Sequence, residues 1–126
     1  MSEADVMNKI IQEEEFRYIE SGKGQPLIIL HGLMGGLSNF KGVMDYFPKK
    51  GYQIIIPELP VYSLPILNTS VKSLSEFLLK FIAFRSLKNF ILLGNSLGGH
   101  VGLLFARNHP ELCLLYTSDA ADDTPC

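Results

Sequence analysis

Short apolar runs alternate along this chain with longer segments in which apolar residues recur at helical spacing. The runs at 27–30, 52–56 and 90–93 are too short for helices and are bounded by turn residues, so they predict buried strands. The amphipathic segments predict helices over 38–47, over 70–85, and from Leu97 to a stop at His109 and Pro110. Strands that alternate with helices favour an α/β fold with a mostly parallel sheet and flanking helices.

The limits of these elements and the two ends of the chain carry further predictions. We expect Pro48 to stop the first helix, Pro57 to end the pairing of the strand before it, and Ser73 with Glu76 to form a capping box. Residues 6–15 suggest a short amphipathic helix, although the alternation in 16–19 allows a first strand instead. Near the other end, 112–117 are apolar enough to pair as a strand, whereas 118–126 are expected to hang free.

Composition narrows the function classes. A chain of 126 residues with 47% hydrophobic residues is typical of one soluble globular domain. Eleven basic and thirteen acidic residues give a net charge of -2 without a basic cluster, which argues against nucleic acid as a partner. The apolar runs are too short to span a membrane, and the acidic N-terminus is not a secretory signal, so we expect a cytoplasmic protein. Cys113 and Cys126 have no metal-ligand spacing, and we expect neither a disulfide nor a metal.

The strongest chemical signal lies where the run 90–93 stops at Gly94 and a helical pattern begins at Leu97. Between them the chain reads Gly94-Asn95-Ser96-Leu97-Gly98. Side chains at 94 and 98 would clash in so tight a corner, and the N–H of Leu97 would point at an oxygen bound beside Ser96. A plain structural turn or a phosphate-binding glycine loop is the alternative, but neither phosphate-loop pattern can be read from Gly94 onward.

This strand, turn and helix resemble the nucleophile elbow of the α/β-hydrolase superfamily, in its serine-nucleophile branch. A second strand-to-glycine corner, His31-Gly32-Leu33-Met34, resembles the oxyanion loop of the same superfamily. The resemblance implies Ser96 as the nucleophile and the backbone N–H groups of Leu33, or of Met34, and of Leu97 as oxyanion donors. It also implies that His31 braces its loop rather than acting as a base. Serine at the elbow argues against the haloalkane dehalogenase and epoxide hydrolase branches.

The partners of the serine are harder to find. In this superfamily the acid and then the histidine follow the nucleophile along the chain. His100 lies one helical turn beyond Ser96, but the family places its base on a loop after the last strand. Glu58, in a proline-rich loop over 57–65, is better explained as a solvated acid than as a catalytic carboxylate.

Residues 113–122 read like the direct translation of the end of a transposase-type sequencing adapter. We therefore divide the chain into 1–112, the N-terminal part of an α/β-hydrolase domain whose C-terminal half is missing, and 113–126, an artefactual tail. The acids of this tail are then no candidates for a catalytic triad.

The resemblance implies an esterase-like serine hydrolase for a small molecule, an ester, thioester, amide or similar carbonyl compound, acting through an acyl-serine without a cofactor. Lacking its acid and base, this chain is expected to be inactive. Two alternatives stay open: a non-catalytic small-molecule or anion-binding module built on the two glycine corners, and a piece without stable function that aggregates through an open sheet edge.

Overall fold

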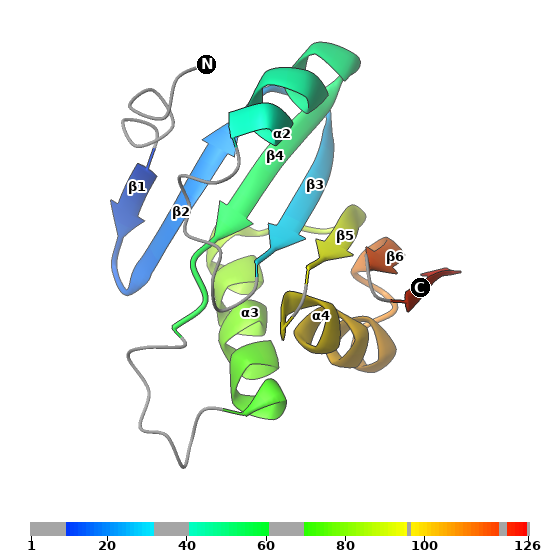
Figure 1. Cartoon of the computed structure of the whole chain (residues 1–126). Coiled ribbons are helices and arrows are strands. Elements are labelled where there is room, and N and C mark those ends of the chain that lie inside the picture. Colours follow the sequence, from blue (N-terminus) through cyan, green and yellow to red (C-terminus); the bar gives the residue numbers. More distant parts are fainter. Residues whose placement is uncertain (1–9, 32–40, 61–69, 96, 119–120, 126) are drawn as a thin grey trace.

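The computed structural model describes residues 10–31, 41–60, 70–95, 97–118 and 121–125, which form a single sheet with helices on both faces (Figure 1). The elements are β1 (Ile10–Glu13), β2 (Phe16–Ser21), β3 (Gln25–Leu30), α2 (Lys41–Tyr46), the 3-10 helix η2 (Phe47–Lys50), β4 (Tyr52–Pro57), α3 (Val71–Arg85), β5 (Phe90–Gly94), α4 (Leu97–Asn108), β6 (Cys113–Ser118) and β7 (Ala121–Pro125). No helix in this part of the chain is long and apolar enough to cross a membrane.

The described strands form a seven-stranded sheet in the order β1-β2-β4-β3-β5-β6-β7. The four central strands β4, β3, β5 and β6 are parallel to one another, whereas β1, β2 and β7 pair antiparallel at the edges. The chain leaves β3 to one side to form β4 and then crosses to the other side to form β5. The α/β class and the mostly parallel sheet predicted from the sequence are therefore confirmed.

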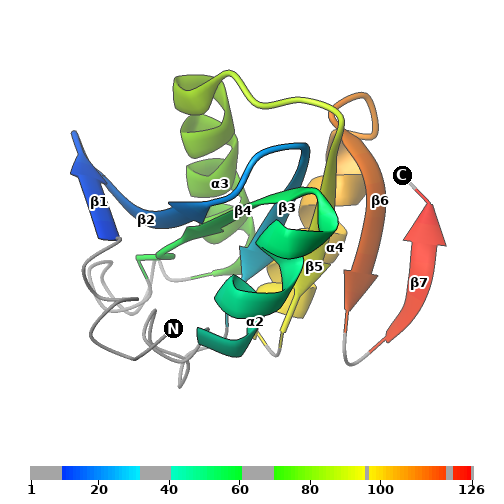
Figure 2. The same cartoon turned by 90° about the horizontal axis from the view of Figure 1, so that it is seen from above.

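The two faces of the sheet carry different helices, as the view from above shows (Figure 2). Helices α3 and α4 pack on the face that includes Ile28, Leu30 and Leu92, and α2 packs through Met44 on the opposite face. Neighbouring residues of β3 alternate between the two cores because side chains of a strand point to opposite faces in turn. The apolar runs of the sequence are therefore strands buried on both sides.

The N-terminal segment differs from the predicted helix. Residues 6–9 lie outside the described residues, but Ile10–Glu13 form β1, which pairs antiparallel with β2. Glu14 turns the chain with a φ of 54°, and the Gln12 amide donates to the backbone carbonyls of Glu14 and Phe16 at 3.1 Å each. These contacts close a hairpin and satisfy the backbone of its turn, so pairing with β2 overrides the helical spacing of the apolar residues.

The helix limits correct three details of the sequence analysis. The cap of α3 is Ser70, whose Oγ accepts the N–H of Ser73 at 3.1 Å, so the capping box expected at Ser73 and Glu76 is wrong. The α-helix before Pro48 ends at Tyr46, and Pro48 then lies in the first turn of η2, where its missing N–H costs nothing. β4 includes Pro57, which lies opposite Tyr18, one residue beyond the predicted end of the strand.

The C-terminal segment is part of the sheet. β6 runs parallel to β5, and Cys113 and Tyr116 on it are buried in the core shared with α4. The prediction that 118–126 hang free is wrong for Ser118, which is the last residue of β6, and for Ala121–Pro125, which pair with β6 as β7. Backbone pairing with the exposed edge of β6 is available to almost any extended segment, so this strand needs little from its sequence.

Candidate active site

The candidate nucleophile follows β5 in the sequence. The carboxyl ends of β5 and β3 lie at the same end of the parallel strands. Leu30 and Gly94 are the last paired residues of the two parallel strands, and Asn95 extends the pairing by donating its N–H to the Leu30 carbonyl at 2.9 Å. His31 and Asn95 therefore leave the sheet side by side. From this position the connection that leaves β3 runs to β4 on one side, and the connection that leaves β5 runs to β6 on the other, which makes it the switch point at which α/β sheets bind ligands.

The corner between β5 and α4 has no room for side chains at its two glycines. A Cβ at Gly94 would lie 2.5 Å from the carbonyl oxygen of Gly98, and a Cβ at Gly98 would lie 2.4 Å from the carbonyl oxygen of Leu30. The turn is closed by the Gly98 N–H, which donates to the Asn95 carbonyl at 2.9 Å. The steric reason predicted for both glycines is present in the structure. Ser96, between Asn95 and Leu97, lies outside the described residues.

The expected oxyanion donors are only partly described. Leu97 is the first residue of α4, so its N–H belongs to the positive end of the helix. Gly32 and Leu33, and Met34 after them, lie outside the described residues, and the roles of Leu33 and Leu97 stay predictions. His31, immediately before that loop, is described.

The His31 side chain is 5% exposed, and its Nε2 accepts the backbone N–H of Leu59 at 3.2 Å. An accepting nitrogen carries no proton, so a neutral imidazole in this arrangement has its hydrogen on Nδ1. Leu59 follows β4, and the bond therefore joins the loop after β4 to the start of the loop after β3. This contact agrees with the bracing role that the sequence resemblance implies for His31.

Comparison with known proteins decides the family. The family model described as alpha/beta hydrolase fold matches residues 25–126. The chain belongs to the α/β hydrolase fold family.

Three relatives show how similar this α/β hydrolase chain is to known members. The crystal structure of MGS-MChE2, an α/β hydrolase enzyme from the metagenome of lagoon sediments at Mar Chica, Morocco, is 53% identical with a TM-score of 0.82, covering 86% of this chain and 50% of that one. A 2-hydroxy-6-oxononadienedioate/2-hydroxy-6-oxononatrienedioate hydrolase of Paraburkholderia phymatum is 34% identical, over 79% of this chain and 37% of its own. A probable alcohol acetyltransferase of Cyberlindnera fabianii is 32% identical, over 71% of this chain and 25% of its own. The chain thus spans between a quarter and a half of these relatives.

The remaining histidines of this α/β hydrolase chain do not approach the elbow through any described contact. His100 is exposed on the first turns of α4, whose buried face is formed by other residues. His109 lies just beyond the other end of α4, stacked on Phe105 with ring centroids 4.8 Å apart and paired with Glu111 at 3.5 Å. Because α4 runs from the carboxyl end of β5 back to the start of β6, His109 lies near the amino ends of the parallel strands, whereas Asn95 lies at their carboxyl ends.

The candidate acid Glu58 also has a structural partner. Its carboxylate pairs with Arg17 at 3.5 Å, and both side chains are nearly half exposed. This agrees with the prediction of a solvated loop acid. Among the described residues no three His, Cys, Asp or Glu side chains gather into a possible metal site.

One residue beside the elbow was missed by the sequence analysis. Tyr116 on β6 is 1% exposed, and its hydroxyl donates to the carbonyl of Gly99 in the first turn of α4. Its ring fills the space next to Gly102, where a Cβ would come within 2.5 Å of the ring. No local pattern signals this contact, and the assignment of 113–126 to a tail removed Tyr116 from consideration.

Proposed function

We propose that this chain carries the nucleophile and the oxyanion donors of a serine hydrolase for ester, thioester, amide or similar carbonyl substrates. Ser96 is the nucleophile, and the N–H groups of Leu33 and Leu97 are the donors. The observation that carries the proposal is the approach of Gly98 to the Leu30 carbonyl, where a Cβ would lie only 2.4 Å away. This approach brings the start of α4 against the end of β3, and it supports a site shared by the segments that follow β3 and β5.

The proposed chemistry is acyl transfer through a covalent intermediate. The Ser96 oxygen bonds to the substrate carbonyl carbon while its proton passes to a base, and the carbonyl oxygen becomes an oxyanion held by Leu33 and Leu97. When this intermediate collapses, the leaving group departs with a proton and Ser96 keeps the acyl group. Water then attacks the acyl-serine in the same way, releases the acid and restores the hydroxyl.

The names of the relatives support a carbonyl substrate without choosing among the classes. An alcohol acetyltransferase transfers an acyl group, and a 6-oxo dienedioate contains a ketone carbonyl that a serine could attack. Both names indicate chemistry at a carbonyl carbon, which is where the proposed nucleophile and oxyanion donors would act. We therefore propose a small carbonyl compound as substrate, and none of the proposed steps needs a metal or cofactor.

We expect the isolated chain to acylate slowly and not to turn over. His31 accepts a hydrogen bond from Leu59. His109 lies near the amino ends of the parallel strands, and His100 is exposed on the surface of α4. None of these three is positioned by a described contact to take the Ser96 proton. In serine hydrolases, loss of the base costs up to about 10⁶ in rate, while the oxyanion hole and binding retain about 10³–10⁴ over water.

The test is acetylation of the 126-residue chain by p-nitrophenyl acetate, followed by intact mass and peptide mapping. We expect slow acetylation that reaches one group per chain and maps to Ser96, and its absence in Ser96→Ala. Ser73→Ala is the control, because Ser73 lies on α3, distant in sequence from Ser96. This variant should be acetylated at Ser96 as fast as the wild type. Peptide mapping separates this result from acetylation of a cysteine. The proposal would be contradicted if the acetyl groups were distributed over several lysines, or if Ser96→Ala were labelled as much as the wild type.

A further inference from the structure

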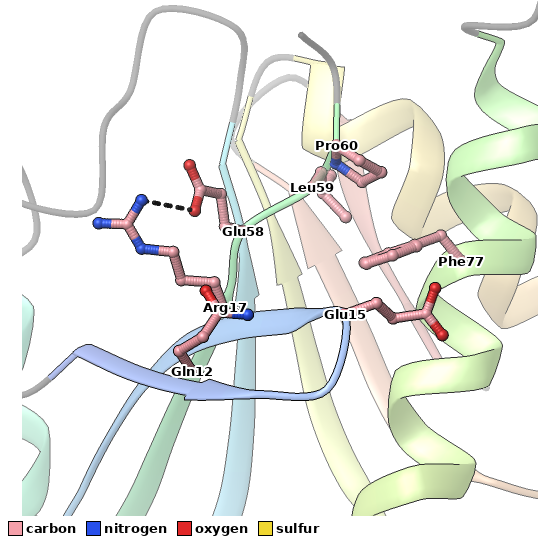
Figure 3. Close-up of a pocket in the computed structure, with 7 residues that line it drawn as sticks. All are labelled: Gln12, Glu15, Arg17, Glu58, Leu59, Pro60 and Phe77. Atoms are coloured by element: carbon pink, nitrogen blue, oxygen red, sulfur yellow. Dashed lines mark ion pairs between the residues drawn. The ribbon is translucent and has the colours of Figure 1, made fainter. Parts of the chain in front are cut away.

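A cavity of about 280 Å³ lies between the β1–β2 hairpin, the segment after β4 and helix α3 (Figure 3). The start of β2 lies at the carboxyl end of β4, as the pairing of Tyr18 with Pro57 shows, so the cavity opens at the same edge of the sheet as the elbow. β2 is nevertheless three strand positions from β5, a separation of about 14 Å. The cavity is therefore a separate feature from the corner that contains Ser96.

The charged side of this cavity is unbalanced. Arg17 and Glu58 form an ion pair at 3.5 Å, so the guanidinium already has an acidic partner. Glu15, in the hairpin turn, lines the same cavity and makes no ion pair with any described residue. Two carboxylates and one cation leave an excess of one negative charge, and Glu15 is the group available to a ligand.

The opposite side of the cavity is apolar. Figure 3 shows Phe77 of α3 projecting toward Leu59 and Pro60, with Glu15 close below its ring. The Phe77 ring packs against Phe16 at a centroid distance of 5.4 Å, and Leu59 is 2% exposed, so both are held in place by the core. A ligand that fills this space therefore meets a fixed apolar wall on one side and a carboxylate beside it.

We infer that this cavity binds a small organic ammonium ion, with its apolar body against Phe77 and Pro60 and its charged group on Glu15. An anionic ligand fits less well, because it would have to compete with Glu58 for Arg17 while facing Glu15. The cavity volume of about 280 Å³ is just below the range of about 300–1,000 Å³ found for ligand pockets, which limits the ligand to about one ring. This inference is independent of the proposed hydrolase function.

The exposure of the Glu15 side chain limits the affinity that we expect for the ligand. A solvent-exposed ion pair contributes up to about a fivefold change in Kd, and the remaining affinity comes from contact with the apolar wall. We therefore expect weak binding, with a millimolar Kd, and only a small preference for the cation over a neutral ligand of the same shape.

The experiment is a titration of the whole ¹⁵N-labelled chain, followed by NMR, with three probes of one shape. Benzylammonium, benzyl alcohol and benzoate differ in charge at the same position. We expect benzylammonium to bind about fivefold more tightly than benzyl alcohol, benzoate to bind most weakly, and the shifts to centre on the hairpin turn and on Phe77. Equal or tighter binding of benzoate would overturn the inference.

Variants of two neighbouring residues distinguish binding in the cavity from a non-specific attraction of the cation to acidic side chains. Glu15→Gln should weaken benzylammonium binding to the level of benzyl alcohol and leave benzyl alcohol unchanged. Glu14→Gln is the matched control, since Glu14 is exposed in the same turn but does not line the cavity. Equal effects of the two variants, or none from either, would show that no specific site exists here. Both changes are isosteric on exposed side chains, so both proteins should fold.

Discussion

The hydroxyl of Tyr116 on β6 donates a hydrogen bond to the backbone carbonyl of Gly99 in the first turn of α4. The same ring occupies the space that Gly102 leaves open one turn later. Gly99 is three residues from Ser96 along the chain. The strand that follows α4 therefore holds the beginning of this helix, which adjoins the turn after β5.

Tyr116→Phe removes this hydrogen bond and keeps the ring. We expect the free energy of unfolding to fall by about 1 kcal/mol, measured by urea denaturation. The loss stays small because the Gly99 carbonyl can still accept the helical N–H four residues further on. Tyr46→Phe is the control, because Tyr46 is 56% exposed and its change should stay within about 0.5 kcal/mol. Equal stability of the two variants would show that the buried bond contributes nothing.

The contrast between Ser96 and Tyr116 shows which parts of the site the sequence could predict. The corner around Ser96 is encoded locally, since an apolar run, two glycines and a helical pattern follow each other within a few residues. The bond between Tyr116 and Gly99 joins residues that are 17 positions apart and depends on how β6 packs against α4. The apolar run at 112–117 did predict a strand here, but its packing against α4 depends on the order of strands in the sheet, which no local pattern specifies.

Gly98→Ala tests the close approach of α4 to β3. The new Cβ would meet the Leu30 carbonyl oxygen at 2.4 Å and its carbon at 2.6 Å. These are backbone atoms that cannot rotate away, so we expect a loss of about 3 kcal/mol or more in the free energy of unfolding.

Gly42→Ala is the matched control for Gly98→Ala. Gly42 lies in α2, and a Cβ there meets no atom of the described residues within 4 Å. The higher helix propensity of alanine should therefore stabilise the protein by about 0.5–1 kcal/mol. A Gly98→Ala protein as stable as the wild type would mean that α4 does not cross β3 as closely as described, and would remove the main support for the elbow.

The first hairpin and the cap of α3 show why other details escaped the sequence analysis. The apolar pattern that includes Ile10 and Ile11 fits a helix or a strand, and only the pairing with β2 decides between the two. Ser70 and Ser73 are both suitable caps, and no local pattern decides which of them begins the helix. Central strands were predicted more reliably, because burial on both faces leaves a continuous apolar run.

Tyr18 should titrate abnormally. Burial and the hydrogen bond that its hydroxyl donates to Glu13 raise the pKa of Tyr18 from 10.0 to about 12. Because the folded pKa exceeds the unfolded value, the stabilisation is complete below pH 10 and is lost as the pH rises towards 12. Two pKa units correspond to at most about 3 kcal/mol.

Comparison with Tyr18→Phe isolates this effect. Unfolding free energies measured between neutral and strongly alkaline pH should fall more steeply in the wild type than in Tyr18→Phe. Absorbance titration should also show one late tyrosinate that the variant lacks. Glu13→Gln should bring this titration to lower pH only in part, since burial is the larger cause. A wild-type titration in which no tyrosine ionises late would contradict the raised pKa.

His31 offers a last test, because bracing and proton transfer predict different outcomes for the same substitutions. In His31→Phe the buried N–H of Leu59 loses its acceptor at Nε2, which should cost about 1–3 kcal/mol and speed hydrogen exchange at the Leu59 amide. His31→Gln places a carbonyl oxygen near the position of Nε2, so it should restore much of the stability and of the amide protection. If His31 only braces the loop, His31→Gln should also acetylate Ser96 at close to the wild-type rate. A loss of about 10²–10⁴ in that rate, with stability restored, would instead identify His31 as the base.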